Sequence, residues 1–178
     1  LGWQGLLEKV RTCREKLNPK DTSFLDGEEL LLEGIISWVG HLADDAEAKA
    51  AAEKDEFHRQ NYLEIARINR KLMTEKPASF REACQFLAHF QSVDRMFCSG
   101  GGLDSIDGML RDYYIADIEA GTLNDEQAVW MIASLLYNDT HYSMLGGLTP
   151  DGSRDTVDRL SFVVLEATHQ LMIPSDVA

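Results

Sequence analysis

The chain has 178 residues, of which 44% are hydrophobic and 26% are charged, a composition typical of an ordinary globular protein. Its formal net charge of −13 argues against nucleic acid or an anionic membrane as a partner, since both need a cationic face. No apolar run is long enough to span a membrane, and no signal peptide is recognisable, so we expect a cytoplasmic protein. The first residue is not Met, which suggests a chain cut from something longer.

The first 76 residues predict long helices. Residues 2–17 form one, and the Asn18-Pro19 pair ends it. Asp26 is expected to cap a second, much longer helix that starts two residues later. A break near Asp55 then leads into further helix as far as about Thr74. Two long antiparallel helices would form one wall of a helical layer.

Residues 77–178 predict more helices and at most one or two short strands. Ser79 and Glu82 form a capping box, and Asn124 with Gln127 forms another. The expected helices span 80–97, 105–120, 125–138 and 156–171, the last capped by Ser153 or Asp155, and the expected strand is Tyr142–Leu145. The aromatic residues expected in the core are Trp38, Tyr113, Tyr114 and Trp130. The fold class is therefore mainly α, and no linker or repeat divides the 178 residues.

The three cysteines, Cys13, Cys84 and Cys98, are odd in number and far apart in the sequence. This pattern favours reduced thiols over a disulfide framework or a zinc site. Free cysteine is among the most buried residue types, so we expect Cys84 and Cys13 to be packing residues.

An ordered set of motifs begins at Pro77. Residues 77–85 read Pro-Ala-Ser-Phe-Arg-Glu-Ala-Cys-Gln, residues 101–104 read Gly-Gly-Leu-Asp, and residues 113–118 read Tyr-Tyr-Ile-Ala-Asp-Ile. The pattern continues through Gly121, Leu123, Glu126, Gly146-Gly147, Asp151-Gly152, Leu165-Glu166-Ala167 and Leu171-Met-Ile-Pro174. Together these motifs resemble the glycyl radical enzymes, the pyruvate formate-lyase-like superfamily, well after Pro77 and weakly before it.

The resemblance implies that residues 1–178 are part of the α/β barrel of a longer enzyme, with residues 1–76 as a long-helix segment and 77–178 as a partial barrel segment. Such a parent would be a lyase or acyltransferase that cleaves C–C, C–N or C–O bonds of a small polar substrate. It would be an anaerobic homodimer whose glycyl radical is installed by an S-adenosylmethionine iron–sulfur activase. The chain lacks both the Arg-Val-x-Gly motif of the radical loop and the family's cysteine loop, so we expect it to carry no cofactor and to be inactive alone.

The glycine-rich turn is the place where the resemblance implies contact with substrate. Family substrate pockets draw on this turn, which makes Ser99 and Cys98 the candidate binding residues. The alternative is that both residues only end a helix. No catalytic residue and no metal ligand is expected in this chain.

A competing interpretation is a free-standing helical protein. Asp55-x-x-His58 and Glu166-x-x-His169 have the spacing that places a carboxylate and an imidazole on one helix face, as in di-iron carboxylate bundles. His58, Glu166 and His169 would then be metal ligands. The other form of this alternative is a non-enzymatic interaction module.

Overall fold

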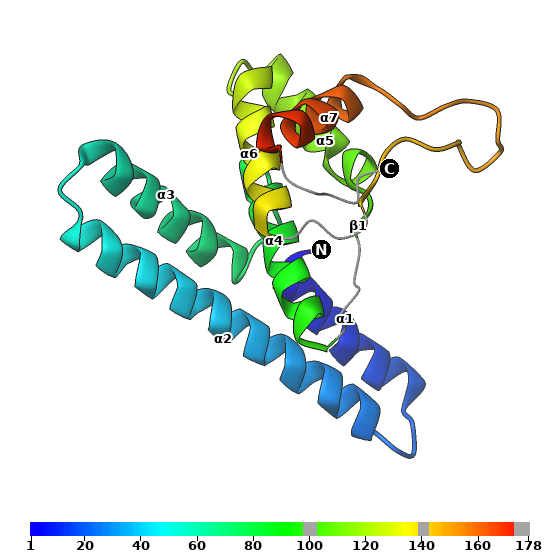
Figure 1. The fold of residues 1–178 in the computed structure, drawn as a ribbon. Helices are drawn as coiled ribbons and strands as arrows, with labels where there is room; N and C mark the ends of the chain where they lie inside the picture. The colour runs from blue at the N-terminus through cyan, green and yellow to red at the C-terminus, as the bar shows by residue number, and fades with distance from the viewer. Residues whose placement is uncertain (98–102, 139–142, 173–178) are drawn as a thin grey trace. The chain divides into compact units, whose positions relative to one another are not determined.

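The computed structural model describes residues 1–97, 103–138 and 143–172, without the side chains of Phe97 and Asp104. The chain divides into two compact units, Leu1–Pro77 and Ala78–Ala178, here called unit 1 and unit 2. The described residues contain seven helices and two short strands, which confirms the mainly α fold class (Figure 1). None of the described helices is both long and apolar enough to cross a membrane.

Unit 1 is built from three helices, α1 (Gly2–Leu17), α2 (Ser23–Ala52) and α3 (Glu56–Leu72). The first half of α2 packs on α1 and the second half packs along α3, which returns beside it (Figure 1). The small buried residues of the second half let the helices approach closely; they are Ala43, Ala46 and Ala50.

The ends of these helices test the expected breaks. Asp55 caps α3, because its carboxylate accepts a hydrogen bond from the His58 backbone N–H at 3.0 Å, so the break near Asp55 is confirmed. The expected cap at Asp26 is wrong. The second helix starts at Ser23, and Asp26 lies in its first turn, where a carboxylate complements the positive end of the helix dipole.

Unit 2 contains α4 (Phe80–Phe97), α5 (Ile106–Glu119), α6 (Asp125–Asn138) and α7 (Arg159–Leu171). The strands β1 (Leu103–Ser105) and β2 (Ser143–Met144) pair in parallel, with Leu103 opposite Ser143. The expected strand near Tyr142–Leu145 is therefore confirmed at Ser143–Met144. The core of unit 2 joins all four helices through their largest fully buried apolar side chains: Phe80, Ile106, Leu110, Ile132, Leu136, Leu160 and Val164.

Three expectations for unit 2 are wrong: the start of the last helix, its cap and the burial of Trp130. The last helix begins at Arg159 and its cap is Asp158, so the expected start at 156 and the caps Ser153 and Asp155 are wrong. Trp130 is 68% exposed, whereas Tyr114 is buried as expected. The spacing of apolar residues in α6 does not indicate which face of the helix is covered by another element. The described part of the chain does not cover Trp130.

Candidate functional site

The best-defined polar site in unit 2 starts from Asp107, in the first turn of α5. This side chain is fully buried, and its Oδ1 accepts hydrogen bonds from the Ser105 hydroxyl at 2.7 Å and the Gly108 backbone N–H at 2.8 Å. Its Oδ2 accepts from the Gly146 backbone N–H at 2.9 Å and from the Ser161 hydroxyl. One carboxylate thus holds the start of α5, the segment after β2 and the first turn of α7 together.

The ionisation of Asp107 follows from these contacts. Burial alone would raise the pKa of this carboxyl group. The hydrogen bonds from Ser161, Ser105, Gly146 and Gly108 outweigh burial and leave the pKa below its ordinary value. Asp107 is therefore a carboxylate at neutral pH, with all of its described partners acting as donors.

A second contact joins α5 to the cap of α7. The Arg111 guanidinium pairs with the Asp158 carboxylate and donates to the Thr156 carbonyl oxygen at 2.6 Å. Asp158 in turn caps α7, accepting from the Leu160 N–H at 2.9 Å, while the Ser161 hydroxyl accepts from the Asp158 N–H at 3.1 Å. The reciprocal bonds form a capping box.

A third contact runs from α5 to the start of α6. The Tyr114 hydroxyl donates to Asp125 Oδ1 at 2.6 Å, and Arg159 donates to Asp125 Oδ2 at 2.6 Å. Burial and the neighbouring carboxylate raise the pKa of Tyr114 to about 12. The bonds from Tyr114 and Arg159 lower the pKa of Asp125.

The motif beginning at Pro77 also has a structural explanation. The Asp117 carboxylate accepts from the Phe80 backbone N–H at 2.8 Å, and the Phe80 and Tyr114 rings meet edge to face at 5.8 Å. The Ser79 hydroxyl accepts from the Glu82 N–H at 3.3 Å, as in a capping box. The Glu82 carboxylate accepts at 2.9 Å from the N–H of Ala78, one residue before the N–H that a strict capping box uses.

The second expected capping box is confirmed in both directions, between Asn124 and Gln127. These motif residues start helices and fasten them to one another.

This arrangement is suited to holding a scaffold, not to proton transfer. A general acid or base at neutral pH needs a pKa near the working pH. Instead, Asp107 and Asp125 are held below their ordinary pKa range, and Tyr114 is raised above its own. The polar network of unit 2 therefore fixes three helix ends without supplying a reacting group.

Asp107, Arg111 and Asp158 were not predicted as members of this network. The motif at the glycine-rich turn contains Asp104, three residues before the buried carboxylate. A local signal was present, since Ser105, Asp107 and Gly108 stand together at a helix start. The long-range donors could not be read from the sequence, because Gly146 and Ser161 lie 39 and 54 residues away.

The candidate binding residues Cys98 and Ser99 lie outside the described residues, in the segment that joins α4 to β1. Their proposed contact with substrate stays a prediction. Cys84 is buried as expected, and burial raises the pKa of its thiol, whereas Cys13 is only half-buried.

The alternative metal ligands occupy exposed positions. His58 lies in the first turn of α3 next to its cap, with its Nδ1 3.4 Å from the Asp55 carboxylate. Glu166 and His169 are exposed on α7, and Glu166 accepts a hydrogen bond from Gln170 at 2.8 Å. Among the described residues, no group of three or more His, Cys, Asp or Glu side chains could hold a metal ion.

Comparison with characterised proteins covers almost the whole chain. The family model described as pyruvate formate lyase-like matches residues 1–175. The glycyl radical subunit of 4-hydroxyphenylacetate decarboxylase from Clostridioides difficile is 22% identical over 97% of this chain and 23% of its own length. Isethionate sulfite-lyase from Bilophila wadsworthia is 24% identical over 95% of this chain and 24% of its own length.

Solved structures give the same result. A solved structure described as 1,2-propanediol dehydration in Roseburia inulinivorans is 27% identical, with a TM-score of 0.86. The similarity covers 98% of this chain and 25% of the chain in that structure. A glycyl radical enzyme from Archaeoglobus fulgidus matches 99% of this chain and 26% of its own, with a TM-score of 0.85 and 25% identity. The chain thus spans about a quarter of the length of these relatives. The match of the family model over residues 1–175 shows that this chain belongs to the pyruvate formate lyase-like family, and the relatives named above are glycyl radical enzymes.

Proposed function

We propose that these 178 residues are an internal part of a glycyl radical enzyme and that they do not catalyse its reaction alone. The observation that carries the proposal is a difference in coverage. The family model spans residues 1–175, yet the chain matches only 23% to 26% of the length of its relatives. A segment of this size would supply scaffold, while the radical and the reacting cysteine would come from the rest of the polypeptide.

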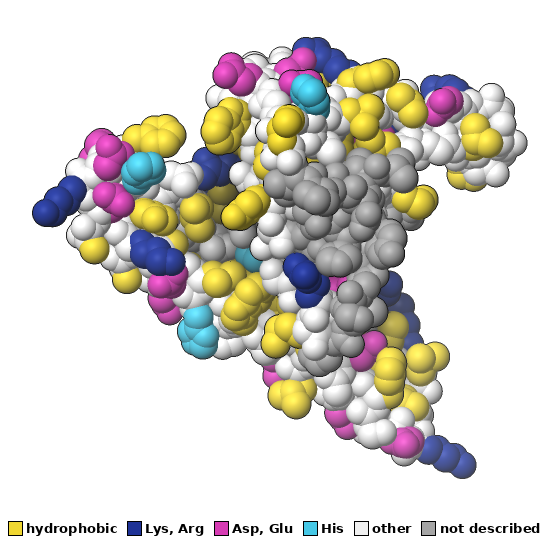
Figure 2. All heavy atoms as spheres, viewed as in Figure 1, with side chains coloured by type: hydrophobic (Ala, Val, Ile, Leu, Met, Phe, Trp, Pro, Cys, Tyr) yellow, Lys and Arg dark blue, Asp and Glu magenta, His cyan; other side chains and the backbone are white. Residues whose placement is uncertain are grey.

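The surface of unit 2 supports this proposal. Large apolar side chains left exposed in number are expected where a surface contacts another part of a protein. Figure 2 shows apolar side chains on the visible face of the molecule. The exposed large apolar residues of unit 2 are Phe90, Met96, Met109, Ile115, Trp130, Tyr137, Met144, Leu148, Val157, Phe162, Leu165 and Met172.

The small sheet is a second support. Parallel sheets are normally covered on both faces by helices and extend over several strands. Here β1 and β2 contribute three and two residues. Two such strands bury too little surface to form a stable sheet by themselves, so we infer that the parent protein continues the sheet.

The reaction of the parent is proposed as radical cleavage of a C–C, C–N or C–O bond in a small polar substrate. The relatives are named for decarboxylation, sulfite release and dehydration, so the family name alone does not select among substrates. Ser99 and Cys98 are the proposed substrate contacts in this chain. The proposed partners are the remainder of the polypeptide, a second subunit and an S-adenosylmethionine iron–sulfur activase, in an anaerobic cytoplasm.

Electron paramagnetic resonance tests the proposal. The native polypeptide that contains this segment is incubated anaerobically with S-adenosylmethionine, a reductant and an anaerobic extract of its source as the supply of activase. We expect a glycyl radical signal in the native polypeptide and none in a sample of the 178-residue chain treated in the same way. A signal in the 178-residue chain would refute its proposed inactivity. No signal in the native polypeptide, despite activation of a known glycyl radical enzyme in the same extract, would refute the proposed parent.

A further inference from the structure

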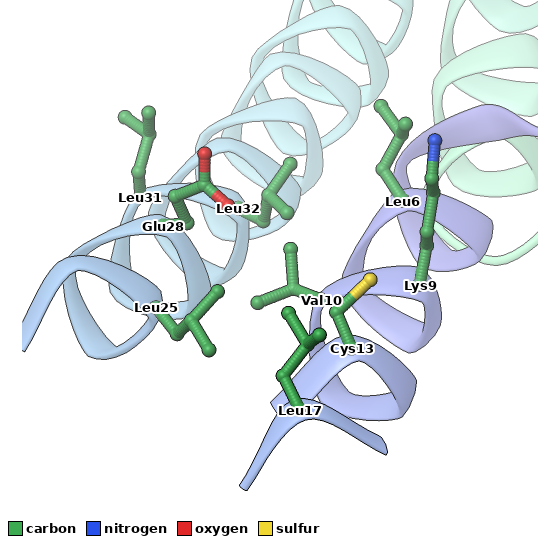
Figure 3. A pocket seen from close by; sticks show the side chains of 9 residues that line it. All are labelled: Leu6, Lys9, Val10, Cys13, Leu17, Leu25, Glu28, Leu31 and Leu32. Carbon is green, nitrogen blue, oxygen red and sulfur yellow. The ribbon is translucent and has the colours of Figure 1, made fainter. Parts of the chain in front are cut away.

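Unit 1 contains an apolar groove between α1 and the first half of α2. Its volume is about 450 Å³. Figure 3 shows side chains of α1 on one wall and side chains of α2 on the other. Seven of the nine lining residues are apolar or cysteine: Leu6, Val10, Cys13, Leu17, Leu25, Leu31 and Leu32. The other two, Lys9 and Glu28, stand on opposite walls.

Ion pairs hold the two walls together. Arg11 contacts Glu29 at 2.5 Å and Glu33 at 2.8 Å, and Arg14 contacts Asp26 at 2.6 Å and Glu29 at 2.8 Å. None of these five residues lines the groove. An exposed ion pair contributes little alone, but a network of this kind fixes the spacing of two helices. The groove therefore lies on one side of the α1–α2 pair, and the ion pairs join the two helices on another side.

The groove leaves apolar surface in contact with water. Leu17 is 73% exposed and Leu31 is 43% exposed, and Cys13 is half-buried. Each of these leucines keeps part of its apolar side chain in water, and covering that part would be favourable. A covering segment with an apolar face would provide that burial.

We propose that this groove is the docking site for an amphipathic helix of the same polypeptide that lies outside these 178 residues. The inference rests on the proposed function, because the covering helix comes from the remaining three-quarters of a polypeptide as long as the relatives. A volume of about 450 Å³ accommodates inserted side chains and not a helix backbone. The helix therefore inserts apolar side chains between α1 and α2 in the manner of knobs into holes.

The charges on the groove walls specify the covering helix further. Lys9 on α1 favours a carboxylate on the docking helix, and Glu28 on α2 favours a cation. The occupant is thus a helix with large aliphatic residues at steps of three and four and with opposite charges on its two flanks.

Thiol labelling of the native polypeptide tests the inference, with Cys13 as a reporter inside the groove. A thiol reagent is added to the native and to the urea-unfolded protein, and labelled peptides are assigned by mass spectrometry. If a helix covers the groove, Cys13 should react about 100-fold more slowly in the native protein than in the unfolded protein. Cys84, which is buried in unit 2, serves as the protected reference in the same sample.

A pair of variants separates a covered groove from general protection. Leu32→Glu places a charge in the groove and should restore rapid labelling of Cys13. Leu30→Glu changes the same residue type on the same helix at an exposed position that does not line the groove, and it should leave labelling of Cys13 unchanged. Labelling of native Cys13 within a few-fold of the unfolded rate would overturn the inference without any variant.

Crosslinking identifies the occupant. An amine-reactive crosslinker should join Lys9 to a peptide outside these 178 residues, in a product with the mass of one polypeptide. Links from Lys9 only to a second copy of this segment would assign the groove to a subunit contact and refute the docking helix. A native polypeptide of about 20 kDa would refute the proposed function itself, whereas a long polypeptide with a reactive Cys13 would refute only the docking helix.

Discussion

Replacing Asp107 with Asn isolates the contribution of its charge to the polar network of unit 2. Asn has nearly the same shape as Asp but replaces one acceptor oxygen with an NH2 group, which can only donate. Each carboxylate oxygen of Asp107 accepts one hydroxyl and one backbone N–H, so either orientation of the amide faces a backbone donor. The Ser105 or Ser161 hydroxyl can rotate away, and the Gly108 N–H also donates to the Ser105 hydroxyl at 3.2 Å, so the main loss is the charge that all four donors share.

The expected cost follows from those contacts. Hydrogen bonds to a charged group contribute about 1.5–3 kcal/mol, and the amide removes the charge from the bonds of all four donors. Asp107→Asn should therefore lower the free energy of local opening around Gly146 and Ser161 by about 2–3 kcal/mol. Because the folded carboxyl has a lowered pKa, the wild-type advantage is present above the ordinary value of 3.8 and is lost as the pH falls further.

Hydrogen exchange measured by mass spectrometry reads this local opening directly. A loss of about 2–3 kcal/mol corresponds to about 30- to 150-fold faster exchange at neutral pH. The increase should appear in peptides that cover Gly146 and the first turn of α7. The matched control is Asp112→Asn on the same helix, where the side chain is exposed, and its exchange should match the wild type. Exchange at Gly146 within threefold of the wild-type rate in Asp107→Asn would refute the structural role given to the carboxylate.

Three further predictions concern other residues of unit 2. Asp117→Ala removes the acceptor for the Phe80 N–H and should destabilise the start of α4 by about 0.5–2 kcal/mol. Hydrogen exchange in the first turn of α4 should then be faster. Unchanged exchange there would contradict the capping role. Burial lowers the pKa of His89 to about 4, so the unfolded state binds the proton first as the pH falls through 6.5. Unfolding free energy should therefore drop by about 2 kcal/mol between pH 7.5 and pH 5, and His89→Gln should remove that part of the pH dependence. Cys84 should resist a thiol reagent at pH 8 in the native state, because burial raises the pKa of its thiol; labelling as fast as in urea would show that the α4 core opens readily.

Local chemistry in the sequence was enough to locate most helix ends of unit 2. The Asn124 and Gln127 side chains bond each other's backbone N–H groups, and α4 and α6 span the expected 80–97 and 125–138. Errors arose where several residues capable of capping stand close together. Asp158 takes the cap of α7 in place of Ser153 or Asp155, and it also pairs with Arg111 on α5.

Tertiary contacts account for what the sequence could not predict. The exposure of Trp130 depends on which face of α6 receives a partner, and its helical spacing carries no such information. The role of Asp107 depends on the Ser161 hydroxyl, 54 residues away in the sequence. The local motif therefore includes Asp104 but gives no indication of Asp107. The groove between α1 and α2 was hidden for a different reason. A stripe from Leu6 to Leu17 predicts a buried face, but not whether the covering element belongs to the same segment.

These residues are proposed to be part of a longer glycyl radical enzyme polypeptide, and the intact mass of the native polypeptide in its source tests that proposal. Denaturing purification with an antibody against this segment, followed by mass spectrometry, measures that mass without any assumption about substrate. A mass several times the 20.0 kDa of this chain is predicted, with an Arg-Val-x-Gly motif and a separate cysteine loop in the additional sequence. A native mass of about 20 kDa would contradict the claim and would direct attention to iron analysis and partner capture.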